Sequence, residues 1–168
     1  SELIVQASSL DKRKERVSMK AVQLPTRDDY RQVWKTILRS SGIGVFIGIL
    51  PAEGATVASM IGYNEAKRWS KTPEQFGKGA IEGIAGSEAA NNAATGGAMV
   101  PTLALGIPGS ATAAVILAGL MVHGIRPGPS MFTEQANFAY TIFWSMMLVN
   151  LLFLVVGLTG AKIFARIT

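Results

Sequence analysis

The stretch GILPAEGAT, residues 48–56, places a proline, a glutamate and a glycine in the middle of an apolar segment. That segment, residues 41–61, has the length that crosses about 30 Å of hydrocarbon as one helix. However, Pro51 removes a backbone hydrogen bond, and a Glu53 carboxylate at that depth is costly. Non-helical backbone is tolerated in a membrane only where protein or a water-filled cavity surrounds it. The sequence therefore predicts a re-entrant helical hairpin over residues 41–66, with a tip that lines a polar site.

The composition favours a membrane location. The chain has 168 residues, of which 49% are hydrophobic, and its mean hydropathy of +0.31 exceeds that of ordinary soluble domains. Residues 1–39 hold nine Lys/Arg and five Asp/Glu, whereas residues 135–161 hold no charge. The basic excess lies beside the first apolar stretch, where anionic headgroups and the positive-inside rule explain it better than nucleic acid does. Without cysteine, disulfides and thiolate metal sites are excluded.

Local signals predict further helices around the hairpin. Thr26 can cap a helix, with Asp29 three residues later, and apolar residues then recur at helical spacing up to residue 40. The run TPEQ at 72–75 similarly predicts the cap of a short surface helix. The uncharged stretch 89–125 has 37 residues, and a straight helix of that length would measure about 55 Å, too long for one crossing. The breakers that interrupt it are Pro101, Gly106, Pro108 and Gly109.

The predicted fold is all-α, a polytopic membrane protein with a re-entrant helical hairpin and discontinuous transmembrane helices. In chain order we expect a polar cytoplasmic loop (1–25), an amphipathic interfacial helix (26–40), the hairpin (41–66), a cytoplasmic surface helix (67–83), a broken transmembrane segment (84–123), a periplasmic loop (124–134) and a transmembrane helix (135–161). With this topology fifteen of the sixteen basic residues lie on one face, and Arg126 lies opposite. The charge pattern does not exclude an added hairpin within 84–122.

Two polar stretches are candidates for a ligand path. EAANNAATGG, residues 88–97, either hydrogen-bonds neighbouring helices or lines a path for a ligand or ion. LGIPGSAT, residues 105–112, is either a proline kink with a cap or a helix start whose N–H groups receive an anion. Transporters bring discontinuous helices together at mid-membrane, so these two stretches and the hairpin tip together favour a transport site.

Enzyme patterns are weak. The glycines at 42, 44 and 48 miss the dinucleotide-binding spacing, and neither a Walker A run nor HExxH is present. His123 and Ser110 offer no nucleophile elbow. We therefore expect no catalytic residue and no metal ligand.

Two stretches strongly resemble a known family. These are GILPAEGATVASMIGYNEAKRWSK (48–71) and FGKGAIEGIAGSEAANNAATGGAMVPTLALGIPGSATAAVILAGLMVHGIRPGP (76–129). They resemble the later half of the large permease subunit of tripartite tricarboxylate transporters, the TctA family, over roughly residues 42–132. The family usually shows Pro-Gly-x-Gly at the hairpin tip, and here Ala52 replaces the first glycine.

The resemblance implies a bacterial inner-membrane permease that crosses the membrane several times. Such a permease works with a small membrane subunit and a periplasmic solute-binding protein, and takes up tricarboxylates or other small carboxylates. A Na+ or H+ gradient drives it, and no cofactor is implied. This chain then resembles one half or a fragment, with the remaining half of the permease as a further partner beside the lipid bilayer.

Carried over by position, the resemblance also implies a site. Glu53 and Glu88 are candidates for cation coupling, because a carboxylate facing an anionic substrate would repel it. Pro51 forms the hairpin tip. The candidate substrate-binding residues are Gly54, Ala55, Asn91, Asn92, Thr95, Gly106, Pro108, Gly109 and Ser110.

Two other functions compete with transport. In a non-transporting scaffold subunit that packs against other membrane proteins, the Asn, Gly and Pro residues would only hold helices together. A membrane-embedded enzyme is the third alternative, and turnover of a carboxylate without translocation would distinguish it.

Overall fold

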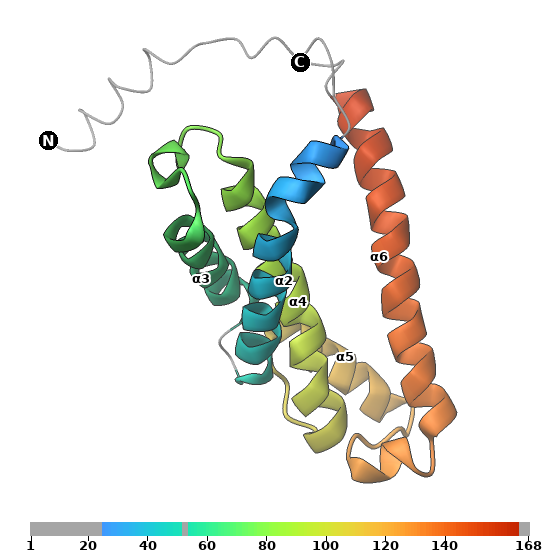
Figure 1. Cartoon of the computed structure of the whole chain (residues 1–168). Coiled ribbons are helices and arrows are strands. Elements are labelled where there is room, and N and C mark those ends of the chain that lie inside the picture. The colour runs from blue at the N-terminus through green and yellow to red at the C-terminus, as the bar shows by residue number, and fades with distance from the viewer. Residues whose placement is uncertain (1–24, 52–53, 165–168) are drawn as a thin grey trace, which may run out of the picture. The chain divides into compact units, whose positions relative to one another are not determined.

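The computed structural model describes residues 25–51 and 54–164, with side chains up to residue 160 (Figure 1). All secondary structure in these residues is helical, which confirms the all-α prediction for the described part of the chain. The α-helices are α2 (Arg27–Ile49), α3 (Gly54–Trp69), α4 (Ile81–Leu105), α5 (Ala111–Val122) and α6 (Ala136–Phe164), and the 3-10 turns are η2 (Pro73–Gln75) and η3 (Pro129–Phe132).

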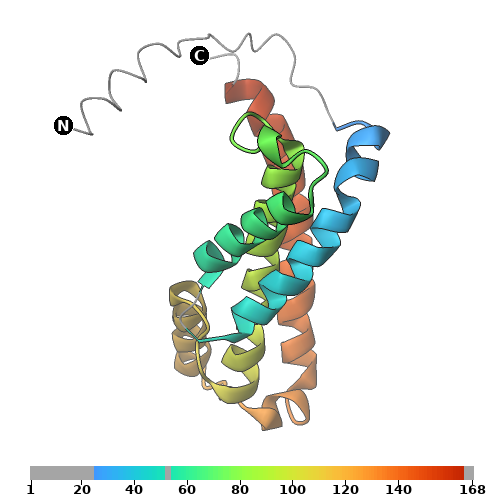
Figure 2. The ribbon, with the colours of Figure 1, turned by 60° about the vertical axis from the view of Figure 1, so that its left-hand side comes forward.

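Helices α2, α3 and α4 pack side by side as a bundle (Figures 1 and 2). Glycine lets their backbones approach closely: a Cβ added to Gly44 would lie 2.2 Å from the carbonyl oxygen of Ala90, and one added to Gly48 would lie 2.3 Å from that of Ala94. Both numbers rise together along the chain, so α2 and α4 run parallel. Each helix buries a row of small residues at four-residue spacing, the pattern that allows close helix packing in membranes. These rows are Ser40, Gly44 and Gly48 of α2, Ala58, Gly62 and Ala66 of α3, and Gly86, Ala90, Ala94 and Ala98 of α4.

The start of α2 follows the sequence prediction. The hydroxyl of Thr26 accepts a hydrogen bond from the Asp29 N–H at 3.3 Å, and the Asp29 carboxylate accepts one from the Thr26 N–H at 2.7 Å. This reciprocal pair is a capping box. The structure differs further on, because α2 continues unbroken through the expected boundary at residues 40–41. Ser40 is buried against α4 there and interrupts nothing, so the expected interfacial helix (26–40) and the first hairpin leg form one 23-residue helix.

The prediction of a surface helix over residues 67–83 is wrong. Helix α3 occupies the chain up to Trp69, and only the three-residue turn η2 follows before α4. Thr72 makes no side-chain cap hydrogen bond. Gly77 and Gly79 have φ angles of 83° and 101°, which lie outside the helical region and end the turn.

Helix α4 also runs past an expected break. Pro101 lies buried inside this 25-residue helix, and the chain turns only after Leu105. Gly106 has a φ of 69°, the left-handed conformation that commonly ends helices. Its N–H group donates to the Thr102 carbonyl at 3.2 Å. The prediction of a break at Gly106 is therefore confirmed, and that at Pro101 is wrong.

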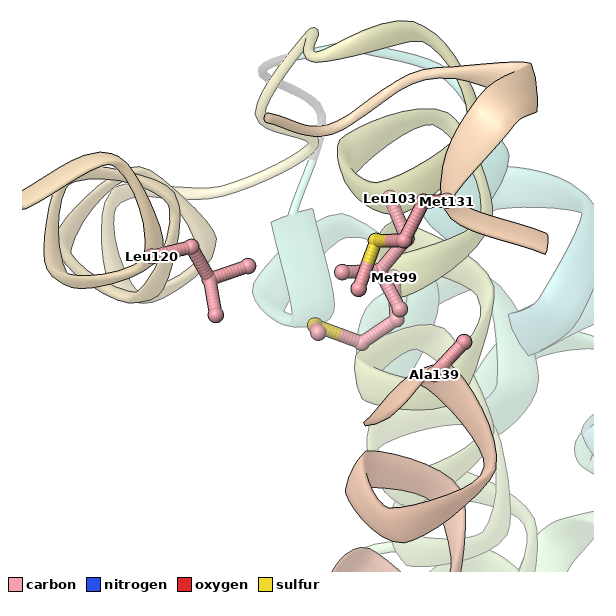
Figure 3. Packing of buried hydrophobic residues seen from close by; sticks show 5 residues of the cluster. All are labelled: Met99, Leu103, Leu120, Met131 and Ala139. Atoms are coloured by element: carbon pink, nitrogen blue, oxygen red, sulfur yellow. The ribbon is translucent and has the colours of Figure 1, made fainter. Parts of the chain in front are cut away.

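A second core forms where the end of α4 meets α5, η3 and the start of α6. Figure 3 shows its five buried residues, with Leu120 extending from α5 toward the others. These residues are Met99, Leu103, Leu120, Met131 and Ala139. This core uses long flexible side chains, unlike the glycine and alanine contacts of the α2–α3–α4 bundle.

By their contacts, residues 25–148 form one unit, and α6 from Val149 onward belongs to another. All residues from 149 to 159 are exposed. Within the described chain, Ala136–Gly160 is the helix that is long and apolar enough to cross a membrane, with a mean hydropathy of 2.2. Helix α5 is apolar but has only 12 residues.

Candidate functional site

Two of the helix interruptions meet in the structure. Gly109, in the turn between α4 and α5, is buried against α4 and the end of α2. A Cβ added there would lie 2.9 Å from the Cα of Ala98 and 3.0 Å from the carbonyl oxygen of Gly48. Because Gly48 stands three residues before Pro51, the α4–α5 turn lies beside the start of the hairpin tip.

Thr102 holds this junction together, although the sequence pattern did not mark it as a site residue. Its side chain is fully buried, and its hydroxyl donates to the Ala98 carbonyl at 2.6 Å. The same oxygen accepts a hydrogen bond from the Gly109 N–H at 3.4 Å. One hydroxyl therefore satisfies a buried backbone group of the turn while remaining bonded to its own helix. A threonine seven residues before Gly109 was the available signal, but only the folded turn brings the two together.

Ser110 starts α5, as predicted. Its hydroxyl accepts a hydrogen bond from the Ala113 N–H at 3.1 Å, which is an N-cap contact. The Ser110 carbonyl takes the first helical hydrogen bond from the Ala114 N–H at 3.0 Å. The N–H groups of Ala111 and Thr112 precede that bond, and such groups at a helix start are available to an anion.

The polar residues of α4 form a stripe that consists of Glu88, Asn91, Asn92 and Thr95. The spacing puts Glu88 and Asn92 roughly opposite Ala90 on the helix, away from the contact with α2 and α3. Glu88, Asn92 and Thr95 are exposed, and Asn91 is half-buried. The Asn92 amide donates to the Glu88 carbonyl at 2.9 Å, a contact within its own helix. Within the described residues, these Asn side chains do not hydrogen-bond to another helix.

The structure brings together only part of the predicted site. Asn92 and Thr102 are ten residues apart on α4, about 15 Å along the helix, so the polar stripe lies away from the Gly109 turn. Gly54 begins α3 with a φ of 66°, and Ala55 packs at the edge of the α2–α3–α4 core. Pro51 is exposed.

The remaining predicted positions lie either in the α4–α5 turn or outside the described residues. Gly106 and Pro108 lie half-buried in the α4–α5 turn. Glu53 and Ala52 lie outside the described residues, as does most of the predicted loop 1–25. No group of three or more His, Asp or Glu residues arranged to hold a metal ion occurs in the part of the chain that the structure describes.

Comparison of the sequence with known protein families finds a match to one family. Residues 1–168, the whole chain, match the tripartite tricarboxylate transporter TctA family. The chain is 39% identical over 133 residues to an uncharacterized 52.8 kDa protein in the TAR-I ttuC' 3' region of Agrobacterium vitis, covering 79% of this chain and 26% of that protein. It is 43% identical over 115 residues to an uncharacterized protein in the TAR-II ttuC' 3' region of the same organism, covering 68% of this chain and 48% of that protein. No solved structure matches it.

Helix interruptions that pack together are typical of membrane transport proteins. The family match is to a transporter family and not to an enzyme family. The chain belongs to the TctA family of membrane permeases, as its EAANNA and PTLxLGIPG stretches suggested. It spans about a quarter and about a half of the two curated relatives, so it corresponds to part of these longer proteins.

Proposed function

We propose that the parent protein is the permease subunit of a cation-coupled, binding-protein-dependent secondary transporter for tricarboxylates or related small carboxylates. Membership of the TctA family supports this function. The structural observation that carries it is the contact between Gly109 and Gly48, because it places two interrupted helices beside each other. Freed N–H and C=O groups at such junctions are the groups with which transporters bind anions and cations.

The helix start at Ser110 is the proposed site for a substrate carboxylate. Its N–H groups carry the positive end of the α5 dipole, and the cap hydroxyl fixes their direction. Asn91, Asn92 and Thr95 offer neutral oxygens and amides along a path to this point. Glu88, exposed on the same stripe, is the proposed cation or proton ligand, together with Glu53 at the hairpin tip.

The proposed setting is the bacterial inner membrane. The hairpin enters from the cytoplasmic side, the segment around α4 and α5 crosses, and α6 crosses back. The proposed partners are a small membrane subunit and a periplasmic solute-binding protein. Large apolar residues remain exposed on α2, α4 and α5, including Phe46, Val100 and Val115, and these faces suit contact with lipid or with the rest of the permease.

Uptake by the full-length parent in proteoliposomes, with its binding protein present, tests this function. Sodium and proton gradients are varied separately to identify the coupling cation. Asn92→Ala and Ser110→Ala should each lower uptake roughly tenfold or more at normal membrane levels, since the first removes a polar contact to the ligand and the second removes the cap that fixes the N–H groups.

Gly96→Ala is the matched control for α4, because a Cβ there meets nothing within 4 Å. It should leave uptake unchanged. Retained uptake in both test variants would reject these site residues, and absence of carboxylate uptake by the unaltered parent under either gradient would reject the function.

A further inference from the structure

Arg39 of α2 lies against Trp69 of α3. The central carbon of its guanidinium, Cζ, is 4.8 Å from the centre of the Trp69 ring, so the cation lies over the ring face. The Trp69 Nε1–H donates a hydrogen bond to the Glu65 carboxylate at 3.1 Å, which holds the ring in this orientation. The contact joins α2 to α3, and the proposed transport site does not use it.

The charge of Arg39 has no counter-ion among the described residues. Arg39 is half-buried, it forms no ion pair with a described residue, and its Nη1 atom is buried without a hydrogen-bond partner. Glu65 is already engaged, because its other oxygen accepts a hydrogen bond from Arg68 at 3.2 Å. A partly buried cation is costly unless an anion neutralises it, so this position favours an anionic ligand.

The pair lies where the charged part of each helix meets an uncharged part. Arg39 is the last charged residue before the uncharged residues 40–52, and Trp69 comes shortly after the uncharged residues 54–64. Tryptophan is enriched where the hydrocarbon of a bilayer meets its headgroups, and arginine near a helix end reaches the same level. Because the TctA family consists of membrane permeases, we expect this guanidinium at headgroup depth.

We propose that Arg39 and Trp69 form a binding site for the headgroup of an anionic phospholipid. The planar guanidinium binds the lipid phosphate through two N–H donors, and the Trp69 ring keeps it in place. Lys35, one turn earlier on the same side of α2, supplies a second cation. The site depends on the membrane location of the family and not on the proposed substrate.

An exposed apolar surface continues from this site along the uncharged part of α2. Gly42 and Phe46 stand three and seven positions after Arg39, so all three lie on one side of the helix. Phe46 is 69% exposed, and a Cβ added to Gly42 would meet nothing within 4 Å. An acyl chain can therefore lie along Gly42 and against Phe46 while its phosphate contacts Arg39. This continuity favours a lipid over a soluble phosphate.

Arginine modification tests the site in the unaltered full-length permease. The protein is placed in bilayer discs of phosphatidylcholine alone or of phosphatidylcholine with phosphatidylglycerol, and phenylglyoxal, which modifies arginine, is added. Modification is read by mass spectrometry. Phosphatidylglycerol should slow modification of Arg39 roughly tenfold or more relative to Arg31. Arg31, on the same helix, has a side chain that is 85% exposed and lies 3.9 Å from Asp28, so it reports the general effect of surface charge.

A further arm separates a lipid from a soluble anion. Inorganic phosphate added to the phosphatidylcholine discs should leave Arg39 as reactive as before. Equal protection by inorganic phosphate and by phosphatidylglycerol overturns the lipid site, and so does equal slowing of Arg39 and Arg31. Equal modification of Arg39 in the two kinds of disc also overturns it, as expected if an acidic protein segment occupied the position.

Variants test the contact by a second measurement. Native mass spectrometry of the purified parent counts the phosphatidylglycerol that stays bound. Arg39→Gln should reduce this amount roughly tenfold, whereas Arg31→Gln should change it little. Arg39→Lys, which keeps the charge and loses the planar fork, should retain less than the unaltered protein.

Circular dichroism checks that each variant is folded, and the modification experiment on the unaltered protein decides if Arg39→Gln is not. Equal retention of phosphatidylglycerol by Arg39→Gln and Arg31→Gln overturns the site. Retention by Arg39→Lys equal to that of the unaltered protein overturns the proposed contact of the guanidinium with the phosphate. None of these measurements requires transport, so a failure of the proposed function leaves their outcome unchanged.

Discussion

The two cores of residues 25–148 are built in opposite ways. Between α2, α3 and α4, buried glycine and alanine bring backbones together, and Ala58 and Ala90 are fully buried. Where α4 meets α5, η3 and α6, Leu103 and Met131 fill the space with long side chains. Backbone contacts leave little room for adjustment, whereas leucine and methionine can change rotamer. The packing of α2, α3 and α4 is therefore fixed by sterics, whereas the contact of α4 with α5, η3 and α6 is fixed by side-chain filling.

The largest effect is expected where backbones touch. Gly44→Val places a Cβ where its nearest neighbour would be the Ala90 carbonyl oxygen at 2.2 Å, and a backbone atom cannot rotate away. We expect a loss of more than about 3 kcal/mol, above the usual range for overpacking. Thermal unfolding of the purified parent in detergent, followed by circular dichroism, measures it.

Gly42→Val is the matched control, because a Cβ at Gly42 meets nothing within 4 Å and both changes put valine in the same helix. Equal destabilisation by the two variants would show that α2 and α4 are not in close backbone contact.

In the second core the expected loss is smaller and depends on how far the cavity collapses. Leu103→Ala removes a fully buried side chain, and such changes cost about 2–5 kcal/mol. Leu105→Ala, two residues later on the same helix, changes a side chain that is 64% exposed and should cost much less. The same unfolding assay compares them. If Leu105→Ala destabilises as much as Leu103→Ala, the distinction between buried and exposed faces of α4 fails.

Thr102 joins the two cores, and its hydroxyl can be removed with little change in shape. Thr102→Val leaves the buried Gly109 N–H without its acceptor, which should cost about 1–3 kcal/mol. Thr56→Val, at an exposed position of α3, is the control for the change in side-chain type. Faster amide exchange at Gly109 in the Thr102 variant alone would support the anchor, and unchanged exchange would contradict it.

Local chemistry made several features predictable. The capping box of Thr26 and Asp29, the left-handed Gly106 and the Ser110 cap each depend on residues within a few positions, so the sequence shows them. The TPEQ run at 72–75 has the same local form but gives only a 3-10 turn, because positive-φ glycines at 77 and 79 stop any helix.

Contacts between distant residues were not predictable. The row of Gly44 and Gly48 shows which face of α2 packs closely, but small residues offer no shape that selects Ala90 and Ala94 as partners. Likewise the contact of Gly109 with Gly48 joins residues 61 positions apart in the sequence and requires α4 to be placed first. The residues of the polar stripe of α4 were named from the sequence. Their distance from the turn was not, because it requires α4 to continue as a helix through Pro101.

The smallest effect is expected at the exposed start of α2, where neither core contributes. The backbone N–H of Thr26, and then its hydroxyl, donate hydrogen bonds to the Asp29 carboxylate and hold the pKa of Asp29 below its ordinary value. A lowered pKa in the folded state means that the ionised form is the stabilised one. The contribution is therefore fully present above the ordinary aspartate pKa of about 3.9 and is lost as the pH falls through the lower folded value. Relative to the intrinsic exchange rate at each pH, amide exchange in the first turn of α2 should rise as the pH falls across that window, and Asp29→Asn should abolish the rise. Asp28→Asn, next to it but 3.9 Å from Arg31 and outside the capping box, should leave the rise intact, and the opposite ranking would mean that simple charge near the helix start, and not the cap, protects this turn.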